Sequence, residues 1–392
     1  MSRKATLNKL VGLKKEIIDE TITTYFKGPN SYTGEDLIEL SVHGGSAIIK
    51  KTLETLSSIG LRAASPGEFT RRAFENNKLD LAQVEAIADL VNAETEMQRK
   101  QAVSNLSGFL FQSTKIIFSD LKKSLANVEA AIDFSDEDLP EKLILDTKEQ
   151  IRNIILRIEK LLIKTNVGKS IKDGFLVSVI GAPNTGKSSF VNYLSGRNVS
   201  IVTNLPGTTR DTIETFIDVG GYPIKLVDTA GIRESENLVE KIGINKAVDL
   251  SKESDVNVVF IEKKQDIKRL AINEVPSIFV VSKQDITKSN FQGDGFFNIS
   301  SITGFGIERI LTKLQKLIEN KAPKESSFIS RERHTNCLSK TVKHLKNSQI
   351  IKNIDLFAED LRLATKEISK LYGGVDIEDI LDIVFSDFCI GK

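Results

Sequence analysis

The residues with the most specific chemistry form one short segment after the apolar run FLVSVI at positions 175–180. The segment GAPNTGKS (181–188) fits the pattern Gly-x-x-x-x-Gly-Lys-Ser/Thr, and the apolar-periodic stretch FVNYL follows it. In a strand, loop and helix of this kind, backbone N–H groups at the helix N-terminus can surround phosphate oxygens. Lys187 can add positive charge at the β- and γ-phosphates, and the Ser188 hydroxyl can bind Mg²⁺. The segment predicts a site for a nucleoside triphosphate.

Two more polar segments follow at the places where a protein that binds a nucleoside triphosphate and Mg²⁺ needs them. DTAG (228–231) ends the apolar run PIKLVD, so Asp228 can reach the Mg²⁺ shell and the Gly231 N–H can meet the γ-phosphate. Before it lies GTTRD (207–211), a predicted switch loop in which Thr208 or Thr209 could close over the metal.

The segment SKQD (282–285) follows the predicted strand SIFVV and indicates which base is bound. Asp285 can accept hydrogen bonds from both N1–H and the 2-amino group of guanine, and adenine has no matching pair of donors. We therefore expect the nucleotide to be GTP.

The residue after DTAG is an aliphatic one, Ile232. Many GTPases carry a glutamine there, which orients the attacking water. Because an aliphatic side chain cannot do so, the domain is either a slow binding switch, or it uses another source of charge and another group to position water.

Composition limits the class of protein. The 392 residues exceed what one core normally serves, and the formal net charge of +1 excludes a global polycation. Any RNA contact must therefore be local. The charged residues of the first segment, MSRKATLNKLVGLKKEIIDE, do not fit a signal peptide, and the sequence favours the cytoplasm with no membrane partner. The last four residues, CIGK, are a poor match to a prenylation motif.

The remaining sequence predicts the elements that position these residues. Apolar residues recur every three or four positions between 109 and 167 and between 323 and 372, which is typical of helices that pack on a partner. Between these regions, short β-rich runs alternate with helical stretches, as in a parallel sheet flanked by helices. We expect a helical domain at 77–172 and 323–392, an α/β domain inserted at 173–322, and a small α+β unit at 1–76.

With these motifs in hand, the chain resembles the MnmE (TrmE) family of tRNA modification GTPases over nearly its whole length. The specific segments are GPNSYTGEDLIEL with HGG (28–45), SPGEFTRRAFENNKLDLAQVEAIADL (65–90), EAAIDF (129–134), DTAGIRES with VEKIGI (228–244) and the terminal FCIGK.

The resemblance implies a fold, an activity and partners. The expected fold is a Ras-like P-loop G domain inserted into an all-α helical-bundle domain, preceded by an α+β domain that binds a one-carbon tetrahydrofolate such as 5-formyltetrahydrofolate. The family acts as a homodimer and forms a heterotetramer with the FAD-dependent protein MnmG. Together they add an aminomethyl or carboxymethylaminomethyl group at C5 of the wobble uridine of certain tRNAs.

The resemblance also implies roles for single residues. A K⁺ ion beside the phosphates would supply the missing charge, held by Asn184, Thr203, Leu205 and Thr208, and Glu240 would position the water. Mg²⁺ would be bound by Ser188 and Thr209. Glu39, Lys78 and Lys392 match folate-binding positions, and Cys389 is the candidate for the modification chemistry. The full expected GTP site is Asn184, Thr185, Gly186, Lys187, Ser188, Ser189, Thr203, Asn204, Leu205, Pro206, Gly207, Thr208, Thr209, Asp228, Thr229, Ala230, Gly231, Ser282, Lys283 and Asp285.

The chain departs from the family pattern in two places. Family members begin with a strand and a glycine-rich turn, which carries an arginine for the folate, upstream of the position that Met1 matches, so we expect the folate domain to be incomplete. In the guanine motif Ser282 stands where the family has asparagine. Because the serine side chain is shorter, we expect a lower affinity for the nucleotide. Two other interpretations remain open, a regulatory GTPase of ribosome assembly and a truncated product that keeps GTP binding alone.

Overall fold

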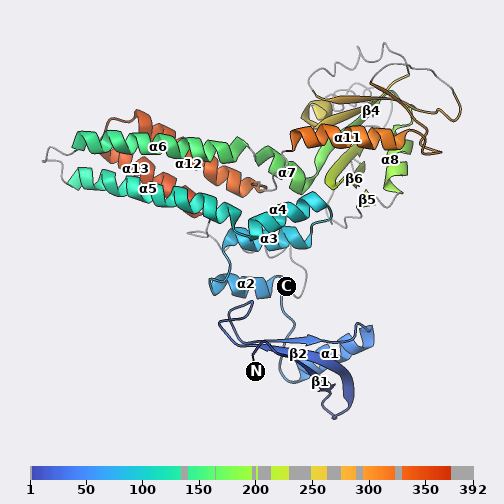
Figure 1. Cartoon of the computed structure of the whole chain (residues 1–392), viewed down its shortest axis with the longest axis horizontal. Coiled ribbons are helices and arrows are strands. Elements are labelled where there is room, and N and C mark those ends of the chain that lie inside the picture. Colours follow the sequence, from blue (N-terminus) through green and yellow to red (C-terminus); the bar gives the residue numbers. More distant parts are fainter. Residues whose placement is uncertain are drawn as a thin grey trace, which may run out of the picture. The chain divides into compact units, whose positions relative to one another are not determined.

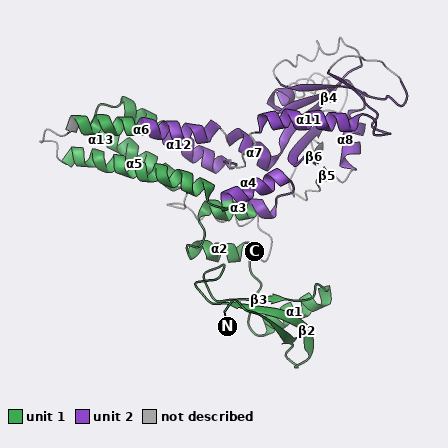
Figure 2. Ribbon diagram, viewed as in Figure 1, with its two compact units in different colours: residues 1–88, 106–151, 343–392 green, residues 89–105, 152–342 purple. Residues whose placement is uncertain are grey.

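The computed structural model describes residues 2–133, 140–163, 165–196, 200–201, 213–228, 249–262, 275–287, 295–322 and 329–371 (Figure 1). The chain forms two compact units, which Figure 2 shows in different colours. Unit 1 comprises Met1–Ala88, Leu106–Ile151 and Lys343–Lys392, and unit 2 comprises Asp89–Asn105 and Arg152–Val342. The domain limits expected from the sequence follow another division and stay a prediction.

Unit 1 begins with a small α+β fold, as the sequence indicated. Three antiparallel strands follow one another in the order β1 (Ala5–Val11), β2 (Ile17–Phe26) and β3 (Leu37–Ser41). Leu7 lies opposite Ile22 in this sheet, and Glu39 lies opposite Thr24. Helices α1 (Ser46–Ser58) and α2 (Glu68–Glu75) follow the sheet.

The helices of unit 1 bring distant segments side by side. Helix α5 (Phe109–Asp133) packs on α13 (Ile354–Ser369), and Arg362 forms an ion pair with Glu129 at 3.3 Å. Lys148 of α6 (Pro140–Ile163) donates to the carbonyl of Ile351, just beyond the end of α12 (Glu332–Ile350). The predicted packing of helices from two separate stretches of chain is therefore confirmed.

The apolar positions that predicted these helices form their buried faces. In α6 the side chains of Ile151, Ile154 and Ile158 are at most 2% exposed. In α13 the side chains of Leu361 and Ile368 are fully buried. A spacing of three and four residues places such side chains on one face, and their burial stabilises the helix by tertiary packing.

Unit 2 contains a seven-stranded sheet in the order β10-β9-β8-β4-β7-β6-β5. The five strands from β10 to β7 are parallel, and β6 and β5 are antiparallel. This order is that of a Ras-like G domain, with β5 as a short addition at one edge. The bounds are β4 (Phe175–Gly181), β5 (Ser200–Ile201), β6 (Ile213–Val219), β7 (Tyr222–Asp228), β8 (Val256–Phe260), β9 (Ser277–Val281) and β10 (Phe296–Asn298).

Helices flank this sheet and supply much of its core. They are α7 (Thr165–Asp173), α8 (Lys187–Ser195) and α11 (Ile307–Lys321). Phe190 of α8 meets Phe260 of β8 edge to face, with ring centroids 5.6 Å apart. Such aromatic contacts stabilise a core beyond the area that they bury. The parallel strands end at one edge, and α8 begins there after β4, which is where ligands bind in folds of this kind.

Helix α4 (Glu96–Leu106) is attached to the α/β part of unit 2 by hydrogen bonds from its first half. The Met97 N–H donates to the carbonyl of Gly221 in the turn between β6 and β7 at 3.0 Å. The Gln98 and Gln101 amides donate to the carbonyls of Lys172 and Gly168 in α7, at 3.0 and 3.1 Å. Helix α3 (Leu81–Val91) precedes it. None of the described helices is long and apolar enough to cross a membrane.

Candidate functional site: a phosphate-binding loop and a base-recognition loop

The phosphate-binding loop connects β4 to α8, as its sequence predicts. Its backbone needs glycine at two points. Gly181 has φ 150°, and an added Cβ there would lie 2.4 Å from the carbonyl oxygen of Phe260. Gly186 precedes the first residue of α8 with φ 96°. Asn184 takes the left-handed conformation with φ 63°, which asparagine tolerates better than most residues. The loop therefore turns sharply before α8. Backbone N–H groups at the N-terminus of that helix can bind phosphate.

Lys187 lies against this loop. It is 4% exposed, and its Nζ donates to the carbonyl oxygens of Gly181 and Ala182, both at 2.8 Å. Thr185, also buried, donates its hydroxyl to the same Ala182 carbonyl at 2.8 Å. These bonds hold the ammonium beside the loop, where it can meet phosphate oxygens.

A pair of oxygen ligands follows directly. The Ser188 hydroxyl donates to Oδ2 of Asp228 at 2.7 Å, and Asp228 is 2% exposed at the end of β7. A hydroxyl and a carboxylate are hard oxygen ligands, which Mg²⁺ prefers. The donor set therefore fits the predicted magnesium site. Ser189, the next predicted residue, is exposed in the first turn of α8.

The base-recognition loop follows β9 and is held by backbone hydrogen bonds. The N–H groups of Ile286 and Thr287 donate to the carbonyl of Lys283, at 3.0 and 2.9 Å, and the Gln284 N–H donates to the carbonyl of Ile299 at 3.1 Å. Lys283 takes the left-handed conformation with φ 62°. Asp285 is exposed, so its carboxylate is open to a base.

Ser282 joins the two loops. Its hydroxyl donates to the carbonyl of Thr185 in the phosphate-binding loop. A Cβ added at Gly186 would lie 3.0 Å from the same hydroxyl oxygen, so the loops are in close contact. The structure thus brings the loop 181–188 into contact with Asp228 and with Ser282 of the base-recognition loop, and the functions assigned to these residues stay predictions.

The other predicted site residues lie outside the described part of the chain. From the GTP, Mg²⁺ and K⁺ sites these are Thr203, Asn204, Leu205, Pro206, Gly207, Thr208, Thr209, Thr229, Ala230 and Gly231. The predicted water-positioning Glu240, the thiol of Cys389 and the terminal Lys392 are also outside it.

The two remaining folate candidates lie in unit 1 and come from separate segments. Glu39 is exposed on β3. Lys78 is exposed after α2, and its Cε lies 3.3 Å from the position of a Cβ built on Gly34. Asn76 fixes the same neighbourhood because its side-chain amide donates to the carbonyl of Thr33 at 2.7 Å. Lys78 therefore lies beside the loop that contains Gly34.

A group of ion pairs that the sequence analysis missed holds this loop to α2. Arg72 pairs with Glu35 of the loop at 2.9 Å and with Glu68 at 2.8 Å, and Arg62 pairs with Glu68 at 2.6 Å. Hydrogen bonds from Arg62, the Ser65 N–H and Arg72 hold the pKa of Glu68 well below its ordinary value of 4.5. The spacing of Glu68 and Arg72, four residues apart on one helix, was the available signal.

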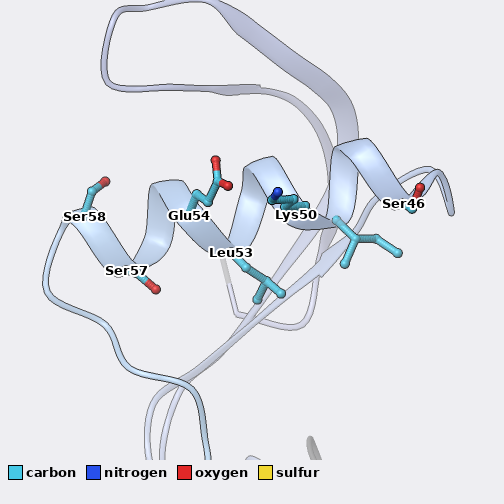
Figure 3. A pocket seen from close by; sticks show the side chains of 7 residues that line it. Ser46, Lys50, Leu53, Glu54, Ser57 and Ser58 are labelled. Carbon is cyan, nitrogen blue, oxygen red and sulfur yellow. The ribbon is translucent and has the colours of Figure 1, made fainter.

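A shallow hollow of about 840 Å³ lies along α1, and Figure 3 shows the side chains that line it. Ile49 and Leu53 are 44% and 57% exposed there, beside Lys50 and Glu54. This arrangement offers an apolar surface. Among the described residues no group of three or more His, Cys, Asp or Glu is placed to hold a metal ion.

The chain is similar to two described protein families and to proteins of several bacteria. Residues 81–389 match the family described as MnmE helical domain, and residues 1–78 match GTP-binding protein TrmE N-terminus. A tRNA modification GTPase MnmE of Pelagibacter ubique is 40% identical over 404 residues, which cover 100% of this chain and 91% of the relative. A protein of the same name from Ehrlichia ruminantium is 41% identical with the same coverage.

The solved structure of the G domain of the T. maritima FeoB iron transporter is 25% identical, covers 38% of this chain and 99% of that one, and has a TM-score of 0.27. The fold assignment follows from the strand order and the phosphate-binding loop, and the two family matches span almost the entire sequence. The chain therefore belongs to the MnmE (TrmE) family of tRNA modification GTPases.

Proposed function

We propose that the chain is a K⁺-stimulated GTPase that modifies tRNA at C5 of the wobble uridine together with the FAD-dependent protein MnmG. One observation carries the proposal, the phosphate-binding loop in which buried Lys187 and the Ser188–Asp228 pair meet the base-recognition loop. The family match over the whole chain supports the link from GTP hydrolysis to tRNA modification.

The described residues suit the binding of GTP and its metal. Lys187 donates N–H groups at a position where β- and γ-phosphate oxygens can replace the loop carbonyls. Ser188 and Asp228, with Thr209 of the switch loop, would hold Mg²⁺, which supplies positive charge to the phosphate oxygens. Asp285 accepts from the Watson–Crick edge of guanine. These contacts position the triphosphate and neutralise its charge, which is most of what phosphoryl transfer requires.

The proposed K⁺ ion and Glu240 would together replace the function of the missing water-orienting glutamine. Ile232 cannot polarise water, whereas Asn184 is exposed on the phosphate-binding loop and carries an amide oxygen that can bind a cation. Bound K⁺ would supply charge beside the phosphates, completed by Thr203, Leu205 and Thr208. Glu240 would accept a hydrogen bond from the attacking water and hold it in line.

We further propose that the N-terminal part of unit 1 binds 5-formyltetrahydrofolate or a related one-carbon tetrahydrofolate and forms the homodimer. Lys78 and Glu39 are exposed there, and Lys392 and Cys389 of the C-terminal tail would complete the folate site. The opposed pair Leu7 and Ile22 is 68% and 48% exposed, which supports an interface between two copies.

We also propose the domain limits 1–76, 77–172 with 323–392, and 173–322, and a cytoplasmic location. The location follows from the substrates, because the proposed reaction requires tRNA, GTP and a reduced folate in one compartment. The heterotetramer with MnmG would bring the FAD of that partner to the folate-derived carbon.

The test is to assay the full chain with MnmG, FAD, a one-carbon tetrahydrofolate, an amine donor and tRNA. We expect GTP hydrolysis that is faster in KCl than in NaCl at equal ionic strength, and modified wobble uridine in nucleoside digests analysed by mass spectrometry. Equal hydrolysis in both salts contradicts the cation mechanism. GTP turnover that responds to ribosomal subunits and leaves tRNA unmodified supports a ribosome-assembly GTPase instead.

A further inference from the structure

The contact between the two loops of the nucleotide site is made by a side chain with one hydrogen-bond donor. The Ser282 hydroxyl donates to the carbonyl of Thr185, a group that can only accept. The bond is partly buried, and a Cβ added at Gly186 would lie 3.0 Å from the hydroxyl oxygen, so Ser282 lies close to the backbone of the phosphate-binding loop. Ser282 is therefore engaged in holding the two loops together.

This engagement has a consequence for the base. A guanine bound through its ribose to phosphates on residues 181–188 has its five-membered ring nearer to that loop than its Watson–Crick edge. The Ser282 side chain is bonded to Thr185 of that loop, which places it on the side of the base that carries N7. Guanine N7 is a hydrogen-bond acceptor. A hydroxyl that donates its proton to the Thr185 carbonyl presents only lone pairs to N7, which is itself an acceptor, and so cannot form a hydrogen bond with it.

Three backbone N–H groups of the same loop are also engaged. The N–H groups of Gln284, Ile286 and Thr287 donate to the carbonyls of Ile299 and Lys283. Asp285 reads the opposite edge of the base. An asparagine at 282 would differ, because its amide has two N–H donors, one for the Thr185 carbonyl and one for N7.

We propose that this GTPase recognises guanine without a hydrogen bond to N7, an inference that rests on the proposed function. Ser282 positions the base-recognition loop against the phosphate-binding loop, and the selection of guanine depends on its N1–H and 2-amino group through Asp285. The site therefore accepts purines that are altered at position 7, provided that their Watson–Crick edge is that of guanine.

The first test compares GTP with 7-deaza-GTP, in which a C–H replaces N7. The full chain is titrated with each nucleotide in the presence of Mg²⁺ by calorimetry, which measures binding and not turnover. We expect the two dissociation constants to agree within about twofold. A preference for GTP of about tenfold, the effect of one net hydrogen bond, would overturn the inference.

The second test restores the missing donor. Ser282→Asn should bind GTP about threefold to tenfold more tightly than 7-deaza-GTP, because the added N–H reaches N7. Ser282→Thr, which keeps one hydroxyl, is the matched control. Its dissociation constants for GTP and 7-deaza-GTP should have a ratio near one. A ratio near one for a folded Ser282→Asn protein, with an unchanged thermal midpoint, would show that position 282 does not face N7.

A third variant separates positioning from base reading. Ser282→Ala removes the bond to Thr185 and should weaken GTP and 7-deaza-GTP by the same factor. Unequal weakening contradicts the proposed role. The failure of this inference is distinguishable from that of the proposed function. A strong preference of the wild-type protein for GTP over 7-deaza-GTP overturns only the inference. Equal hydrolysis in KCl and NaCl overturns the cation mechanism and leaves the ratio of the two dissociation constants unaffected.

Discussion

The nucleotide site and the proposed folate site differ in how their residues are held. In unit 2, Lys187, Ser188 and Asp228 are fixed by hydrogen bonds to one another or to the loop that carries them. In unit 1, Glu39 and Lys78 are exposed and come from a strand and from the residues after α2. The comparison shows that Lys187 is ordered by the backbone carbonyls of its own loop, and that Ser188 is ordered by the carboxylate at the end of β7. A site assembled from separate segments depends on neighbours such as the Arg72 ion pairs.

The largest expected effect tests whether the nucleotide site depends on its buried cation. Lys187→Ala should weaken GTP binding by about 100-fold, because a charge-assisted hydrogen bond to phosphate contributes about 1.5–3 kcal/mol. Calorimetry with GTP measures it. The matched variant Lys78→Ala, which removes an exposed lysine in unit 1, should leave GTP affinity unchanged and weaken binding of 5-formyltetrahydrofolate instead. Loss of GTP affinity in both variants would erase the distinction between the two sites.

The next effect concerns the cation beside the phosphates. Asn184→Ala should lower GTP turnover in KCl by more than about tenfold and remove the preference for KCl over NaCl, since the proposed cation would lose a ligand. Steady-state phosphate release measures it. Asn77→Ala is the control, because Asn77 also has a positive φ, of 54°, and changing it imposes a similar backbone strain far along the chain. A retained K⁺ preference in Asn184→Ala would count against the assignment.

A smaller effect is expected at the proposed dimer surface. Leu7→Ala should weaken homodimerisation by about tenfold, because each of two copies loses apolar area worth about 0.7 kcal/mol. Sedimentation equilibrium gives the dissociation constant. Leu145→Ala removes a side chain of similar exposure, 66% against 68%, from α6 and should leave dimerisation unchanged. An unaffected Leu7→Ala dimer would locate the interface elsewhere.

The smallest effect is the pH dependence of unit 1. The pKa of Glu68 lies below its ordinary value of 4.5 in the folded chain, so its ion pairs stabilise the fold above that value, and this stability is lost as the pH falls through the folded pKa. Glu68→Gln should lower the thermal midpoint at pH 7 and make it less dependent on pH below 4.5. Circular dichroism measures the midpoints. Parallel curves for the two proteins between pH 3 and 7 would contradict the role of Glu68.

Sequence reasoning reached the parts of the fold that depend on local patterns. The Gly-rich loop predicted the turn from β4 to α8, and the spacing of Ile151, Ile154 and Ile158 predicted the buried face of α6. The bond from Ser282 to Thr185 could not be predicted, because it joins residues that are 97 positions apart and depends on where two loops meet. The same holds for Arg72 and Glu35, which are 37 positions apart. Residues in contact across such separations leave no periodic trace in the sequence.

Hydrogen bonds attach α4 directly to the nucleotide-binding part of unit 2. Its Met97 N–H is bonded to the turn that joins β6, which follows the predicted switch loop, to β7, which carries Asp228. Gln98 and Gln101 add a second and a third point of attachment on α7. A displacement of the β6–β7 turn would therefore act on the first residues of α4 through the Met97 N–H, while the bonds to α7 oppose it.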